Sequence, residues 1–177
     1  MKEVLLLLGL LFSVCTLGQK TWSTSDGAIK FVSTKNSDVA AVNNQVNVTI
    51  NDQGELSFNM MIRGFRFEMA EMEDHFNKNY MESDKYPEAA FKGRIFDFKK
   101  INLTKSGLYK VKAEGLMTIH NVTKKIIVSG TLQVDGSAIV LKSKFTIDTD
   151  DYKVDTGLGG VIIGSKMNVE VEGKCQS

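Results

Sequence analysis

The sequence predicts an all-β protein, an antiparallel up-and-down β-barrel of about eight strands with a short helix inserted around residues 68–80. Apolar residues recur at every second position through most of the chain after residue 19, which is strand spacing, and short turn sequences separate the alternating runs. Strands joined by short turns are antiparallel, and strands with one apolar face each can hide their edges by closing on themselves. A two-layer sandwich is the alternative, because periodicity alone does not distinguish the two.

The first strands precede the helical segment. Alternation covers residues 29–34, 46–51 and 56–62, and the sequence Asn-Asp-Gln-Gly at 51–54 supplies a turn between the second and third runs. This part of the chain therefore predicts a strand followed by a hairpin.

A structured interruption follows at residues 74–91, around the only proline of the chain. Pro87 removes a backbone donor and favours an extended conformation at Tyr86. We therefore expect a helical crossing over residues 68–80 and a return to the sheet at 89–91.

The remaining strands are expected at residues 91–97, 110–119, 126–134, 139–147 and 166–172, with turns at 106–107 and 135–136 and a glycine-rich link before the last strand. Gly93, Gly115 and Gly130 lie inside these strands. Glycine in a strand interior often marks a tight bend or a bulge, and barrel closure requires both.

Residues 1–18 have the layout of a secretory signal peptide: Lys2, an apolar run and small residues ending at Gly18. We expect cleavage there, a single exported domain over residues 19–177, and a periplasmic or secreted location. Lipidation of Cys15 is the disfavoured alternative, because Val14 is a poor preceding residue. The apolar run is too short to span a bilayer, so no transmembrane segment is predicted in the mature chain. Cys175, the other thiol, is expected to be a bystander near a frayed carboxyl end.

Charge and titratable residues argue against several function classes. A formal net charge of +1 gives no basic field for nucleic acid. His75 and His120 are the only histidines, and neither lies in a metal-binding or nucleophile motif, so we predict no catalytic residue, no metal and no cofactor. A pocket with a buried histidine paired to a carboxylate, for instance His75 with Glu73 or Asp74, would instead favour an enzyme, because such pairing tunes a catalytic base. The aspartates at 148–151 lack the glycine and glutamate of a calcium loop, which indicates a solvated turn.

Eight methionines, most of them in the middle of the chain, leave two interpretations open. Methionine is flexible and polarizable, so it can line a cavity for long apolar guests or fill gaps in an ordinary core.

Four motifs together resemble the YceI-like family of exported, lipocalin-like proteins. They are Asp-His-Phe at 74–76, Lys-Tyr-Pro at 85–87, Phe-Lys-Gly at 91–93 and Leu-Met-Thr-Ile-His-Asn-Val-Thr-Lys at 116–124, and the resemblance covers about residues 29–171. Asn121 stands where the family commonly has glycine, and asparagine tolerates a left-handed backbone better than most residues. Family members also tend to carry an arginine and a glycine near residues 145–153, where this chain has no arginine and has Lys153.

The resemblance implies a non-catalytic protein that sequesters or carries a long-chain isoprenoid-type lipid in an apolar barrel interior. Ten strand residues are the predicted cavity lining: Phe58, Met60, Ile62, Phe91, Ile95, Met117, Ile119, Leu132, Phe145 and Ile147. The alternative is an envelope protein with a filled barrel core that acts through surface protein contacts. It predicts that Phe58, Met60 and Phe145 pack together across the barrel. A homodimer stays open in either case.

Overall fold

The computed structural model describes residues 19–156 and 163–177. The predicted signal peptide, the cleavage site at Gly18, Cys15 and most of the glycine-rich link lie outside the described residues. The strands in this part of the chain are β1 (Thr21–Ser33), β2 (Ala40–Asn51), β3 (Glu55–Met61), β4 (Arg66–Phe67), β5 (Glu88–Ile95), β6 (Gly107–Ile119), β7 (Val122–Asp135), β8 (Ala138–Asp148) and β9 (Lys166–Cys175).

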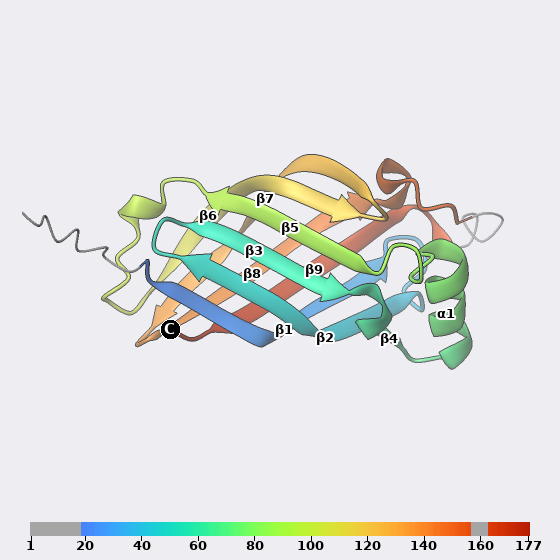
Figure 1. The fold of residues 1–177 in the computed structure, drawn as a ribbon, viewed down its shortest axis with the longest axis horizontal. Coiled ribbons are helices and arrows are strands. Elements are labelled where there is room, and N and C mark those ends of the chain that lie inside the picture. The colour runs from blue at the N-terminus through green and yellow to red at the C-terminus, as the bar shows by residue number, and fades with distance from the viewer. Residues whose placement is uncertain (1–18, 157–162) are drawn as a thin grey trace, which may run out of the picture.

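Eight long strands close into a barrel (Figure 1). They pair antiparallel in the order β1, β9, β8, β7, β6, β5, β3, β2, and β2 pairs with β1 to complete the ring. The predicted antiparallel barrel is thus confirmed, and the sandwich is excluded because the two ends of the sheet join. The two-residue strand β4, which is too short to give an alternating pattern, pairs with the start of β2.

The predicted helix is present and lies across one end of the barrel (Figure 1). It consists of α1 (Ala70–His75), which continues as the wider turn η2 (Phe76–Tyr80). Pro87 precedes β5, and its carbonyl accepts a hydrogen bond from the backbone N–H of Ile62 at 2.8 Å. Short 3-10 turns complete the described elements: η1 (Ile62–Gly64), η3 (Phe98–Lys100) and η4 (Thr149–Tyr152).

The strand glycines do not form the bulges that the sequence predicted. Register is continuous through Gly93, Gly115 and Gly130, and the irregular pairing lies instead around Gly27 in β1. Gly93 faces Gly115, and a Cβ added to either would lie 2.4 Å from a backbone oxygen of the facing strand and within 2.7 Å of the Phe91 ring. The pair therefore leaves room for an aromatic ring over two closely spaced strands.

The end of the barrel opposite α1 is densely packed, and we call it the closed end. Its buried residues are Trp22, Val48, Ile50, Leu132, Val134, Ile139 and Cys175. Trp22 donates its indole N–H to the Ser137 carbonyl oxygen at 2.9 Å.

The prediction of a frayed end at Cys175 is wrong. Cys175 ends β9, pairs with Ile139 and has no exposed surface. Burial raises the pKa of its thiol to about 11. The last strand is held because it lies between β1 and β8, not at an edge of the sheet.

Candidate ligand-binding cavity

The barrel encloses a cavity of about 410 Å³ that extends from its middle to the end covered by α1. Strands β1 and β3 to β9 contribute side chains to its wall, and η1, α1, η2 and η4 contribute at the mouth. Nearly all of these side chains are apolar, as expected where strand alternation places apolar residues on the inner face. A volume of this size lies within the range of small-molecule binding cavities.

Partial exposure of inward side chains shows that this part of the interior is not filled. Met117, Val128 and Phe145 face the cavity and remain partly exposed, whereas Ile50 and Leu132 at the closed end have no exposed surface. The partly exposed side chains therefore border volume that other side chains do not fill.

Nine of the ten predicted lining residues lie in the cavity wall. They are Phe58, Met60, Ile62, Phe91, Ile95, Met117, Ile119, Phe145 and Ile147. Leu132 does not line the cavity: it lies between Tyr109 and Leu141 in neighbouring strands and is part of the closed-end core. Alternation gave the correct face for Leu132, but not its position along the barrel axis. Contact of any of these residues with a ligand stays a prediction.

Sequence reasoning missed an aromatic cluster at the cavity mouth, formed by Phe31, Phe65, Phe67 and Phe76. Their ring centroids lie 5.0 to 5.8 Å apart in five pairs, and all four rings line the cavity. Such pairs contribute beyond their buried area. The cluster packs η2 against β1 and β4, so it holds the helical segment on the barrel. The sequence signal was weak because three of the rings lie in or near short, non-alternating elements.

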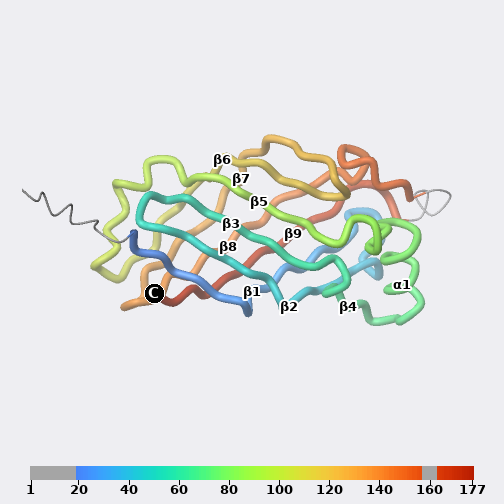
Figure 2. Tube along the Cα trace, in the orientation of Figure 1, coloured from blue at the N-terminus to red at the C-terminus, as the bar shows by residue number. Residues whose placement is uncertain are grey.

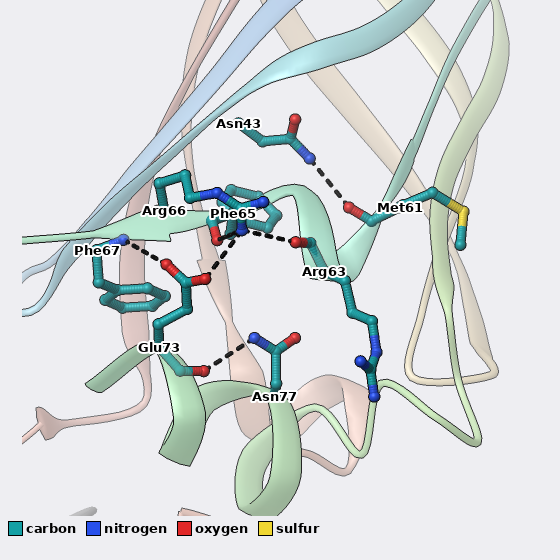
Figure 3. A network of polar contacts seen from close by, with 8 residues as sticks. All are labelled: Asn43, Met61, Arg63, Phe65, Arg66, Phe67, Glu73 and Asn77. Atoms are coloured by element: carbon teal, nitrogen blue, oxygen red, sulfur yellow. Dashed lines mark hydrogen bonds and ion pairs between the residues drawn. The ribbon is translucent and has the colours of Figure 1, made fainter. Parts of the chain in front are cut away.

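A polar network fixes α1 on its outer side (Figure 3). The Glu73 carboxylate accepts hydrogen bonds from the Arg66 guanidinium at 2.9 Å and from the Phe67 backbone N–H at 3.3 Å. Asn77 donates to the Glu73 carbonyl oxygen at 2.9 Å, and Asn43 ties β2 to the Met61 carbonyl at 3.0 Å. Glu73 therefore anchors the helix to β4.

His75 does not pair with Glu73 or Asp74, whereas the largely buried His120 does contact a carboxylate, that of Glu82, outside the cavity lining. His75 is half-exposed, and its ring lies 2.9 Å from the Asn79 amide nitrogen and 4.0 Å from the Glu71 carboxylate, not beside Glu73 or Asp74. Asp74 pairs with Lys78 instead. Within residues 19–156 and 163–177, no three His, Cys, Asp or Glu side chains are grouped so as to hold a metal ion.

His120 belongs to a polar rim beside the mouth. Its Nε2 lies 3.1 Å from a Glu82 carboxylate oxygen, and its ring packs edge-on against Tyr86. Lys85 lies over the Tyr86 ring, and its pKa is raised, first by its hydrogen bond with Tyr86 and then by the Glu82 charge. His120 and Asn121 both have left-handed backbones, with φ of 50° and 58°, so Asn121 serves the turn as the sequence predicted.

The aspartate-rich turn predicted at 148–151 is present as η4. Asp148 caps it by accepting a hydrogen bond from the Asp150 backbone N–H at 3.2 Å, and Asp151 forms an ion pair with Lys124 of β7. Tyr152 is buried against the cavity; burial and then the Asp151 charge raise the pKa of its hydroxyl.

None of the helices in the described ranges has the length and apolar character needed to cross a membrane.

Comparison with known proteins agrees with this architecture. A family model described as the YceI-like domain matches residues 19–175. The fold is similar to that of a polyisoprenoid binding domain from Saccharophagus degradans implicated in plant cell wall breakdown, with a TM-score of 0.72 at 15% identity over 89% of this chain and 98% of that one. It is also similar to Burkholderia cenocepacia BcnA, with a TM-score of 0.70 at 17% identity over 85% of this chain and 96% of that one. The Campylobacter jejuni YceI protein gives a TM-score of 0.59 at 16% identity over 100% and 99% of the two chains. No curated protein matches the chain.

Proposed function

Because the chain belongs to the YceI-like family and encloses an apolar cavity, we propose that it is an exported, non-catalytic protein that carries a long-chain isoprenoid-type lipid inside its barrel. The apolar lining of the cavity is the observation that carries this proposal. Each methylene buried there would contribute about 0.8 kcal/mol, so an extended apolar chain would be held without any polar anchor.

The character of the walls supports an isoprenoid. A branched, methyl-bearing chain is irregular along its length, and the wall combines rigid Phe rings with flexible methionines such as Met60, Met72 and Met81. The structurally similar protein from Saccharophagus degradans is a polyisoprenoid binding domain, which supports the same lipid class here.

The polar end of such a lipid would lie at the mouth. Glu71 and His75 of α1 lie in the wall there with the hydroxyls of Tyr80 and Tyr152, and the Glu82–His120 pair lies on the neighbouring rim. The closed end offers no comparable polar side chains, since its buried residues are apolar apart from the Cys175 thiol. We therefore expect the apolar tail to point toward the closed end.

The filled-barrel alternative is less well supported. It requires Phe58, Met60 and Phe145 to pack against one another, but all three line the cavity. A carrier needs neither a catalytic residue nor a metal or cofactor, and we propose none.

Export is part of the proposal. It is supported by the signal-like layout of residues 1–18 and by a family match that covers residues 19–175. We propose a periplasmic or secreted location after cleavage at Gly18, rather than lipidation at Cys15.

Native mass spectrometry of protein purified without detergent tests the function. We expect a co-purifying lipid, or uptake of one equivalent of added geranylgeraniol. Met117→Trp should lower the affinity at least tenfold (about 1.4 kcal/mol), because the indole would occupy the cavity. Leu116→Trp is the matched control, since Leu116 lies on the same strand and is 53% exposed on the outer face.

A clean apo mass with no uptake of added lipid would count against carriage. So would unchanged affinity in Met117→Trp, because Met117 lies in the wall of the proposed site.

A further inference from the structure

The seam between β7 and β8 is shorter than either strand. Pairing runs from Asp135 with Ala138 to Gly130 with Ser143 and then stops. Beyond that point, residues 122–129 of β7 pair only with β6, and residues 144–148 of β8 pair only with β9. The barrel wall is therefore split along this seam toward the end that carries α1. The tube in Figure 2 follows the β6–β7 hairpin along the upper edge of the barrel.

The cavity reaches the base of this split. On β1, β3, β5, β6 and β9, the strand residues that line the cavity are alternate ones, as expected for a wall seen from inside. On β7 the lining residues are consecutive, 128–131, and on β8 they include the consecutive run 141–143. Successive side chains of a strand point to opposite faces, so the cavity borders both faces of the wall at the last backbone pairs of the seam, which form the base of the split.

Apolar side chains lie on both edges of the split, where an apolar chain could pass. Val128 and Phe145 present apolar side chains at its inner margin, and Ile127 is 60% exposed on the outer face of β7. At the base, the Ser143 hydroxyl donates to the Ser129 carbonyl oxygen at 2.8 Å, next to the last backbone pair. The ion pair between Lys124 and Asp151 ties β7 to η4 near the tip of the hairpin.

The mouth under α1 is, by contrast, held by many contacts. The four-Phe cluster packs beneath the helical segment, and Glu73 bonds to both Arg66 and Phe67. Threading a long chain end-on past this helix would require those contacts to open. Among the described residues, the polar side-chain contacts across the lateral split are the Lys124–Asp151 ion pair and, at its base, the Ser143–Ser129 hydrogen bond, and exposed ion pairs are weak.

We propose that the split between β7 and β8 is a lateral portal through which the apolar chain of the lipid enters sideways, with the Lys124–Asp151 pair as its latch. This inference rests on the proposed lipid-carrying function. It places entry on the side of the barrel and leaves the α1 end as the resting place of the polar group.

Bridging the split tests the portal. The test variant carries Ile127→Cys and Thr146→Cys, on the outer faces of β7 and β8, together with Cys15→Ser. The thiol-reactive cross-linker bismaleimidoethane joins the two new cysteines across the split. Mass spectrometry confirms the bridge, and the buried Cys175 is shielded from the reagent. The matched control joins Thr146→Cys to Asn168→Cys across the paired β8–β9 seam. The probe is nitrobenzoxadiazole-labelled geranylgeraniol, transferred from phosphatidylcholine vesicles.

We expect bridging of β7 to β8 to slow uptake at least tenfold while the amount bound at equilibrium stays the same, and the control bridge to change neither. Unchanged uptake in the bridged protein would overturn the portal and leave the carrier function intact. No probe bound by the unbridged protein would instead overturn the carrier function, and the portal with it.

A second variant tests the latch without a cross-link. Asp151→Asn should speed uptake roughly two- to fivefold, the scale of an exposed ion pair. Asp84→Asn breaks a comparable exposed pair, with Arg63 at the α1 end, and should leave the rate unchanged. Faster uptake in Asp84→Asn alone would show entry under α1 and would overturn the portal.

Discussion

At the closed end, Ile50, Leu132 and Cys175 have no exposed surface, whereas toward α1 the inward-facing Phe58, Met117 and Phe145 stay partly exposed to the cavity. Both regions are built from the same kind of strand, with apolar residues on the inner face. They differ in how completely the side chains fill the lumen. Protein interiors are normally close-packed, so the unfilled half is a departure that needs a reason, and a guest molecule supplies one.

The two ends therefore contribute to different properties, stability at the closed end and ligand binding at the cavity. Dense packing at the closed end supplies stability, because each buried side chain there is surrounded by partners. Side chains along the cavity have fewer packing contacts than those of the closed end, so they contribute less to stability and can contact a ligand. Substitutions at the two ends should therefore separate stability from binding.

The largest expected effect is the stability difference between the two ends. Leu132→Ala should lower the free energy of unfolding by about 2 to 5 kcal/mol, because it opens a void in a filled core. Met117→Ala should cost under about 1.5 kcal/mol, since its side chain already borders open volume. Urea unfolding of the protein without lipid measures both. Equal losses would show that the two ends are packed alike.

The buried thiol of the closed end should make stability depend on alkaline pH. The pKa of Cys175 rises from its usual value of 9.0 to about 11 on folding. The folded state therefore keeps its proton where the unfolded chain loses it. Stability should be fully present below pH 9 and should fall by about 1.4 kcal/mol per pH unit up to pH 11.

Cys175→Ala should remove this component of the slope. Unfolding free energies at several pH values between 8 and 11 compare the variant with the parent. The same slope in both would mean that Cys175 is accessible to water.

The smallest expected effect concerns the attachment of α1. Glu73→Gln weakens the hydrogen bonds to Arg66 and Phe67, and it should cost about 1 kcal/mol or less because the carboxylate is partly exposed. Amide exchange over residues 66–80 should speed up to about fivefold, with no change at the closed end. Glu71→Gln is the control, since that side chain is 89% exposed and lies 4.0 Å from its partner.

Several elements could be predicted from particular residues. Pro87 and the interruption of strand alternation around it located the insertion that became α1 and η2, and Asn121 was placed correctly in a left-handed turn. Period-two alternation gave the inner face of the strands, which is why nine of the ten predicted residues lie in the cavity wall. These features depend on local backbone preferences, which the sequence expresses directly.

Other features depend on contacts between distant segments. The four-Phe cluster joins β1, β4 and η2, and β4 itself is two residues long. Leu132 and Phe145 both lie at inward positions of alternating strands, but Leu132 is in the packed core and Phe145 lines the cavity. The early end of the β7–β8 pairing is likewise a matter of contacts between strands, since residues 122–129 and 144–148 remain strand, paired with β6 and β9.

By itself the sequence determined that the chain alternates as strands, that it turns where it does and which faces are apolar, because strand period and turn preferences act over a few residues. Only the tertiary structure decided where along the barrel axis the lumen is filled and where the wall is split. Those outcomes depend on how side chains from distant strands meet, and a one-dimensional pattern does not contain that information.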